Sequence, residues 1–120
     1  MLSGLAIERL HKMSAGVKQK TFRSPAHLAW VRTLPCVVTG MESDDAHHIV
    51  SAGHGMSGMG TKASDLYTMP MARAAHAELH RDPKRWEQIF DHQSLWIMMT
   101  LAAKCEELYA RVAKLEAGNE

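Results

Sequence analysis

The sequence predicts a small α+β fold, in which a β-hairpin and the helix that follows it are flanked by further helices. Two short runs near the middle of the chain predict the hairpin, and several stretches with helical periodicity or capping signals predict the helices. At 120 residues, the chain is long enough for one modest hydrophobic core. Its 46% apolar and 22% charged residues are ordinary for a globular protein, so the composition favours a single domain.

The N-terminal part of the chain predicts two helices separated by a basic stretch. Residues 2–13 carry apolar side chains at roughly helical spacing, which indicates a short amphipathic helix. The polar stretch that follows is predicted to be a linker or an arm. Ser24 and Pro25 then predict the start of a second helix, because serine caps a helix end and proline suits the first helical position. This second helix is expected to end near Thr33.

The middle of the chain predicts two strands and a loop. Residues 34–40 form a β-branched run that ends at glycine, and residues 46–50 are predicted as a second strand, antiparallel to the first. A loop at residues 53–60 holds four glycines in eight residues. Its backbone N–H groups can approach a phosphate, but flexibility alone explains the glycines equally well. Residues 65–70 are expected to form a short extended segment.

The C-terminal half predicts three helices. Residues 71–81 are rich in alanine, and Asp82-Pro83 separates them from a helix over residues 83–90, because the residue before a proline leaves the α region. In the final helix, apolar residues repeat with alternating steps of three and four, which is a heptad seam. The seam either packs as one stripe on the core or forms a homodimer contact. Its members are Met98, Leu101, Cys105, Leu108, Val112 and Leu115.

These elements divide the chain into a basic N-terminal helix and arm, residues 1–23, and one domain, residues 24–117. Within that domain, residues 34–81 form the core unit and residues 83–117 the C-terminal helices. Residues 1–35 carry six Lys or Arg and one Glu. A basic arm suits contact with a polyanion such as DNA, although exposed lysines are as often simply solvated surface.

Composition also bears on the compartment. Cys36 and Cys105 are the two cysteines, which are too few for a disulfide framework and imply no oxidising environment. No apolar run approaches the roughly 18 residues that a membrane-spanning helix needs. Charged residues also interrupt the first 13 positions, where a signal peptide would have its apolar centre. We therefore expect a cytoplasmic protein with no membrane partner.

Four of the eight histidines lie in two short runs. His76 and His80 are one helical turn apart, so a helix places both imidazoles on one face, a common metal-binding arrangement. The adjacent pair His47-His48 can add a third ligand and leave one imidazole free as a general base. Neighbours on a strand point to opposite faces, which favours this division of roles. The pattern predicts a hydrolytic metal site.

Five motifs in this order resemble the HNH, or ββα-metal, endonuclease superfamily over about residues 34–81. Together they look like a phage and prophage branch of it that includes the recombination-enhancement (Ref-like) nucleases. The resemblance implies a hairpin that carries the first histidines and a metal-binding helix that carries the last. The motifs are LPCVVTG at 34–40, AHHI at 46–49, GMGTKA at 58–63, DLYTMP at 65–70 and HAELH at 76–80.

The resemblance also implies a role for each site residue. It places one divalent metal ion on His47, His76 and His80, and that ion is Mg²⁺, Mn²⁺, Ni²⁺ or Zn²⁺. It makes His48 the general base. The middle asparagine of the family, which steadies the loop facing the base, falls at Asp65, a departure that keeps hydrogen-bonding ability. The implied reaction is metal-dependent hydrolysis of phosphodiester bonds in DNA by an endonuclease.

Many members of the superfamily also hold a structural zinc between two cysteine-bearing knuckles. Here Cys36 is the one thiolate in the first knuckle, and residues 72–75 of the second contain no ligand. A tetrahedral zinc site needs four donors. We therefore expect no structural zinc, and predict that apolar packing of Cys36, Ala72 and Ala75 replaces it.

The expected partner is DNA in a bacterial host cell, in recombination or another DNA-processing step, with a recombination protein as a further partner. Two other classes stay open: a catalytically weakened nucleic-acid-binding protein on the same fold, and a metal-stabilised interaction protein that dimerises through residues 95–115. Basic residues are the expected contacts to the phosphate backbone. They are Lys18, Lys20, Arg23, Lys62, Arg73 and Arg81.

Overall fold

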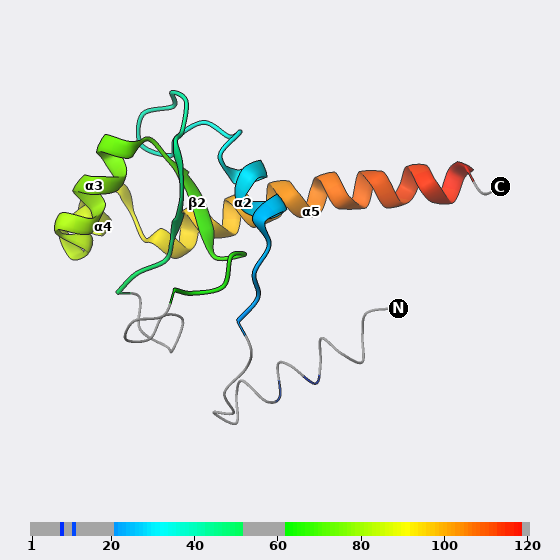
Figure 1. Cartoon of the computed structure of the whole chain (residues 1–120), viewed down its shortest axis with the longest axis horizontal. Coiled ribbons are helices and arrows are strands. Elements are labelled where there is room, and N and C mark those ends of the chain that lie inside the picture. The colour runs from blue at the N-terminus through cyan, green and yellow to red at the C-terminus, as the bar shows by residue number, and fades with distance from the viewer. Residues whose placement is uncertain (1–7, 9–10, 12–20, 52–61, 119–120) are drawn as a thin grey trace.

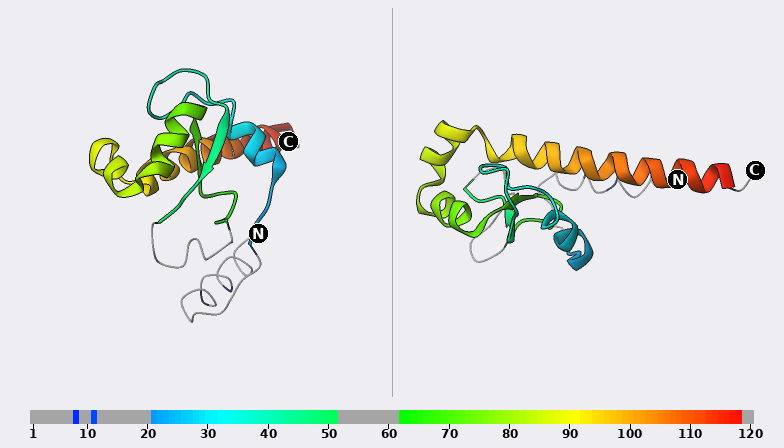
Figure 2. Two further views of the ribbon diagram at one scale, coloured as in Figure 1. Left: turned by 60° about the vertical axis from the view of Figure 1, so that its left-hand side comes forward. Right: turned by 90° about the horizontal axis from the view of Figure 1, so that it is seen from above.

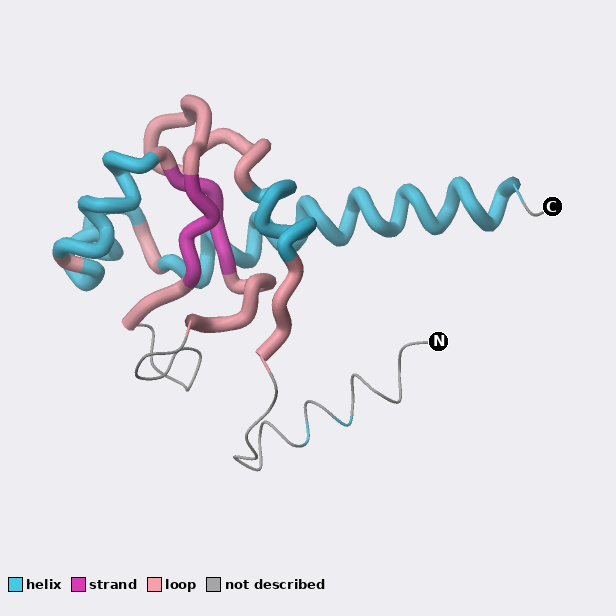
Figure 3. The backbone as a smooth tube through the Cα atoms, viewed as in Figure 1, coloured by secondary structure: helices cyan, strands magenta, loops and turns pink. Residues whose placement is uncertain are grey.

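A computed structural model describes residues 8, 11, 21–51 and 62–118 of the chain. The predicted helix at 2–13 and the glycine-rich loop at 53–60 fall wholly or mostly outside these residues. Four helices and two strands lie within them (Figures 1 and 3), so the predicted mixture of helix and strand is confirmed. In order, the elements are α2 (Pro25–Val31), β1 (Asp45–His48), β2 (Thr68–Met71), α3 (Arg73–Arg81), α4 (Pro83–Phe90) and α5 (Gln93–Gly118).

The two strands form a small antiparallel sheet at the centre of the molecule (Figures 1 and 3). Asp45 pairs with Met71 at one end of the ladder, and His48 pairs with Thr68 at the other. Helices α3 and α4 lie on one side of the sheet and α2 on the other, while α5 runs past the sheet and extends beyond it (Figures 1 and 2).

The prediction of a first strand at residues 34–40 is wrong, because the partner of β1 is β2. Residues 36–41 instead form a tight turn, in which the Cys36 N–H donates to the Met41 carbonyl and the Gly40 N–H to the Cys36 carbonyl, both at 2.8 Å. Gly40 has φ +71°, a conformation that favours glycine. Val37 and Val38 pack against the core. The Val37 N–H donates to the Pro70 carbonyl of β2 at 3.1 Å, but residues 34–40 form no ladder with that strand. The β-branched run therefore reflects burial more than strand pairing.

Helix α2 begins as predicted. The Ser24 hydroxyl accepts from the His27 N–H at 3.1 Å, and Pro25 occupies the first helical turn. Val31 is fully buried and Leu28 half-buried, and His27 lies buried beside Trp30 with ring centroids 5.6 Å apart. The helix therefore presents one face to the rest of the molecule.

Helices α3 and α4 also follow the predicted pattern. Helix α3 starts at Arg73 rather than at residue 71, because Met71 still pairs with β1 and Ala72 is extended. The Asp82 carboxylate accepts from the Arg85 N–H at 3.1 Å and caps α4. The break at Asp82-Pro83 thus turns the chain between the two helices.

The core joins both strands to the helices around them. Cys36 is buried in it, and Ala72 and Ala75 pack against it, as predicted for the replacement of a zinc knuckle. Trp86 is buried, in line with a packing role. The buried apolar residues are Cys36, Ile49, Ala63, Met69, Met71, Leu79, Trp86 and Ile97.

Helix α5 spans 26 residues, but within the described part of the chain it buries residues in its first two turns alone, namely Gln93, Ile97 and Thr100. The Glu87 carboxylate accepts from the Gln93 N–H at 2.8 Å, so a side chain of α4 caps the start of α5. No helix among the described residues is both long enough and apolar enough to cross a membrane.

The heptad seam of α5 does not form a stripe on the core. Cys105 is exposed, so the seam does not lie on the core at this position. Leu108, Val112 and Leu115 are 45%, 48% and 68% exposed. Dimerisation through this seam stays a prediction.

Ile97 is buried and its neighbour Met98 is exposed, which predicts that Ile97 anchors α5 in the core. Ile97→Ala is expected to lower the free energy of unfolding by about 2–5 kcal/mol, because Ile97 is buried in the core. The matched control is Met98→Ala, a 61% exposed position where the change is expected to stay within about 0.5 kcal/mol. Urea unfolding followed by circular dichroism measures both, and equal losses would contradict this anchoring.

The seam prediction is tested by Leu108→Lys combined with Val112→Lys. Both residues lie beyond the part of α5 that contacts the core, so the free energy of unfolding of a monomer is expected to change by less than about 1 kcal/mol. If a second copy covers the seam, light scattering will show the wild type at twice the mass of the variant. A monomeric wild type would exclude the dimer.

Candidate metal centre

Three imidazoles from two elements meet at one place. His47 comes from β1, and His76 and His80 lie one turn apart on α3. One ring nitrogen of each lies within 4.8 Å of the others, and the ring centroids are 4.7 to 5.2 Å apart. The structure therefore brings together the three residues predicted as metal ligands.

Strand alternation separates this cluster from the neighbouring histidine. Asp45 and His47 share the face of β1 that points toward α3, where Asp45 contacts His76 and Arg73. His48 points to the opposite face and contacts Asp65. The adjacent histidines thus enter two different environments, as the sequence predicted.

His47 is fully buried and has one hydrogen bond. Its Nε2 lies 2.8 Å from Oε1 of Gln93. Its Nδ1 is also buried, and no hydrogen-bond partner for it exists among the described residues. Leaving a buried acceptor unpaired costs about 1–3 kcal/mol. A cation bound at Nδ1 would remove that cost.

His76 and His80 present a second unusual contact. The Nδ1 of His76 lies 3.0 Å from the Asp45 carboxylate, which makes Nδ1 the hydrogen-bond donor of that ring. Its Nε2 lies 3.0 Å from Nε2 of His80. One of these two nitrogens must carry a proton to form that bond, and a cation can replace the proton. The three rings therefore offer a set of nitrogen donors for a metal ion.

Burial favours the neutral form of two imidazoles of the cluster, His47 and His80. Desolvation, with a smaller contribution from the neighbouring imidazoles, lowers the pKa of His47 from 6.5 to about 4, although the hydrogen bond with Gln93 acts in the opposite direction. Desolvation also lowers the pKa of His80, with a smaller contribution from the charge of His76. Histidine binds metal in its neutral form. His47 and His80 therefore have lone pairs available for a metal ion without a basic solution.

The other face of β1 carries a histidine–carboxylate pair. The Nε2 of His48 donates to Oδ1 of Asp65 at 2.8 Å, which leaves Nδ1 of His48 as an acceptor. Burial alone would raise the pKa of Asp65, but hydrogen bonds from His48, from the Ser24 N–H and from Arg23 hold it below its usual value. Asp65 is 3% exposed. It therefore contacts His48 directly, rather than only steadying a loop.

The predicted nucleic-acid contacts have different surroundings. The Arg23 guanidinium contacts the carbonyls of Lys62 and Ala63 and the Asp65 carboxylate, so it fastens residues 21–23 to the site rather than standing free for DNA. Arg73 pairs with Asp45 at 3.2 Å. Lys62 and Arg81 are exposed near the site, whereas Lys18 and Lys20 lie outside the described residues.

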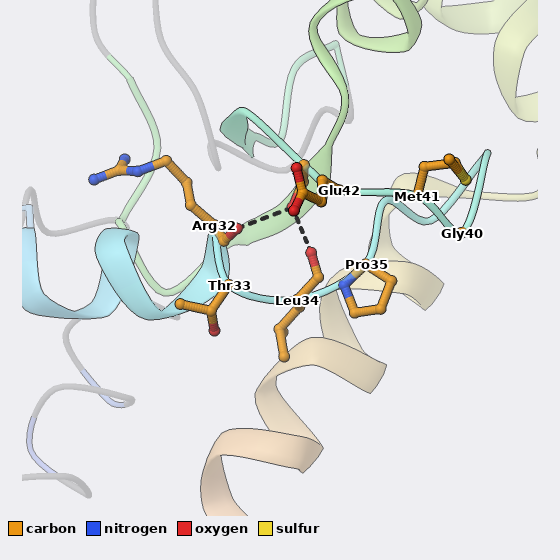
Figure 4. Close-up of a pocket in the computed structure, with 8 residues that line it drawn as sticks. Arg32, Thr33, Leu34, Pro35, Gly40, Met41 and Glu42 are labelled. Atoms are coloured by element: carbon orange, nitrogen blue, oxygen red, sulfur yellow. Dashed lines mark hydrogen bonds between the residues drawn. The ribbon is translucent and has the colours of Figure 1, made fainter.

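A shallow hollow of about 480 Å³ lies elsewhere, between residues 32–35 and 40–43 (Figure 4). The Ser43 hydroxyl lies 3.2 Å from the Arg32 carbonyl and also contacts the Leu34 carbonyl, which closes the loop. The Arg32 guanidinium points away from the hollow (Figure 4). None of the site histidines lines it, so it is separate from the metal centre.

Comparison with known proteins places this chain in a family. Residues 13–106 match the family described as a protein of unknown function (DUF968). The chain belongs to the DUF968 family. The uncharacterized protein YdfU of Escherichia coli (strain K12) is 44% identical over 85 residues, which are 71% of this chain and 22% of YdfU. This chain thus corresponds to less than a quarter of that relative. No solved structure matches it significantly.

The DUF968 match covers all the histidines of the site and also two supporting residues that the sequence did not reveal. Asp45 precedes His47 by two positions, so strand alternation alone could have placed it on the same face. Gln93 lies 46 residues from His47. No local pattern connects the two, because contact between them depends on how α5 packs against β1.

The lowered pKa values predict acid sensitivity of the metal-free DUF968 chain. Stability is fully present above about pH 6.5 and falls toward pH 4, since the unfolded chain takes up protons first. Each pH unit in this window is expected to cost up to about 1.4 kcal/mol through His47 alone. Lowered pKa values at His27 and His80 act in the same direction.

Urea unfolding in EDTA at several pH values measures this loss. His92→Gln is the matched control, because His92 is 75% exposed and its loss should leave the slope unchanged. A free energy of unfolding that stays constant between about pH 7 and pH 5 would contradict the burial of a neutral His47.

Proposed function

We propose that this chain is a metal-dependent DNA endonuclease of the HNH (ββα-metal) type. The observation that carries the proposal is that the two faces of strand β1 carry different kinds of site. On one face, His47 joins His76 and His80 in a metal-binding cluster, and on the other, His48 is held by a buried carboxylate. Metal-dependent hydrolysis of a phosphodiester uses both a bound cation and a base, and strand β1 supplies a residue to each.

His48 is the general base in this mechanism. Its Nε2–H is engaged by Asp65, so its Nδ1 has the free lone pair that can take a proton from the attacking water. Asp65 orients the ring and stabilises the imidazolium that forms, and it is in turn held by Arg23 and the Ser24 N–H. These contacts keep the base in one orientation before substrate arrives.

His47, His76 and His80 would hold one divalent ion. When bound, that ion would supply positive charge to the scissile phosphate and to the leaving oxygen. Three imidazoles and no carboxylate favour Zn²⁺ or Ni²⁺ for tight binding, while Mg²⁺ or Mn²⁺ are the alternatives for turnover. Lys62 and Arg81, both exposed near the site, would contact backbone phosphates without reading bases.

The resemblance to phage and prophage nucleases extends the proposal to a role in DNA recombination or processing. Two features differ from that resemblance. The first strand of the expected hairpin is a turn, and Asp65 replaces asparagine. The turn still packs Cys36 into the core, and Asp65 still bonds to the base, so both departures keep the contacts that the site requires.

Plasmid nicking by the purified protein tests the proposal, with Mg²⁺, Mn²⁺, Ni²⁺, Zn²⁺ or EDTA in parallel. His48→Ala is expected to lower the cleavage rate by about 10²–10⁴-fold and to retain metal binding, because it removes only the base. His80→Ala is expected to bind metal weakly. His92→Ala, on the exposed surface, is the matched control and should cleave as the wild type does.

The proposal fails if no metal and no form of DNA gives cleavage by the wild type. Salt-dependent DNA binding in that case would make the chain a nucleic-acid-binding protein on the same scaffold. Cleavage that is unchanged in His48→Ala would exclude His48 as the base.

A further inference from the structure

We infer that Gln93 is a positioning residue that fixes the tautomer of His47, so that His47 binds its cation through Nδ1 while His76 binds through Nε2. This inference rests on the proposed metal site and deepens it, because it assigns the ligating atom of two of the three rings. Gln93 is fully buried at the start of α5.

The backbone of Val50 fixes the orientation of the Gln93 amide. Its N–H donates to Oε1 of Gln93 at 3.1 Å, and its carbonyl accepts from Nε2 of Gln93 at 2.8 Å. Rotating the amide by half a turn would place two donors together and two acceptors together. The amide oxygen therefore faces His47 for reasons that do not involve His47.

An oxygen at 2.8 Å from Nε2 of His47 requires that nitrogen to carry the proton. A neutral imidazole has one proton, so Nδ1 of His47 keeps its lone pair. That atom is buried and has no hydrogen-bond partner among the residues described, a property that it shares with Nε2 of His27. The lone pair is thus both present and unused, as a metal ligand requires.

Asp45 imposes the opposite tautomer on His76. The carboxylate is 3.0 Å from Nδ1, which therefore carries the proton and leaves Nε2 with the lone pair. That Nε2 lies 3.0 Å from Nε2 of His80. Outer-shell partners of this kind orient ligands and typically contribute 10- to 100-fold in metal affinity. Gln93 and Asp45 together define two donor atoms, Nδ1 of His47 and Nε2 of His76.

Long-range ¹H–¹⁵N NMR of the metal-free protein tests the tautomers directly. The expected result is a proton on Nε2 of His47 and on Nδ1 of His76. In Gln93→Met, which removes the acceptor while keeping an unbranched side chain, His47 is expected to populate both tautomers. A proton on Nδ1 of His47 in the wild type would overturn the inference.

Titration with Co²⁺, followed by its visible absorption, tests the consequence for binding. Gln93→Met is expected to weaken Co²⁺ binding by about 10- to 100-fold. Thr100→Val is the matched control, because Thr100 is buried on the same helix and bonds to the Trp96 carbonyl instead.

The outcomes separate this inference from the proposed nuclease. Equal Co²⁺ affinity in the wild type and in a folded Gln93→Met variant would overturn the inference alone. Tight Co²⁺ binding that depends on Gln93, but without cleavage of any DNA, would overturn the nuclease alone. A wild type that binds no Co²⁺ would overturn both.

Discussion

The pairing of β1 with β2 is the constraint on which the rest of the site depends. The ladder holds β1 extended from Asp45 to His48, and an extended strand must direct successive side chains to opposite faces. His47 is thereby directed toward α3, and His48 toward Asp65. Without the ladder, neighbouring histidines could collapse into one cluster, and the separation of two chemical tasks would be lost.

Burial fixes the orientation of the polar side chains around the sheet, but it also removes them from water. His47, Gln93 and Thr68 are fully buried polar residues, and each must find hydrogen bonds inside the molecule. Gln93 satisfies its amide with Val50 and offers its remaining acceptor capacity to His47. Among the described residues, Nδ1 of His47 and Nε2 of His27 are buried without a hydrogen-bond partner. The nitrogen of His47 belongs to a ring of the histidine cluster, where a bound ion would satisfy it.

Local signals in the sequence were sufficient to predict the helices and the grouping of the histidines. Ser24-Pro25 and Asp82-Pro83 act within a single turn of chain, so their effect does not depend on the rest of the fold. The one-turn spacing of His76 and His80 likewise needs only a helix. The prediction of a strand at residues 34–40 was wrong because a β-branched run indicates burial but does not determine whether another strand pairs with it. Heptad spacing does not show how far the core extends along α5, so it did not reveal that Cys105 is exposed.

The position of Gln93 has a structural consequence. It lies in the first turn of a helix about 39 Å long, most of which projects beyond the body of the molecule. The buried residues that hold α5 in the core, Ile97 and Thr100, follow Gln93 within the first turns of the same helix. The packing of α5 and the orientation of the His47 imidazole therefore depend on the same short segment.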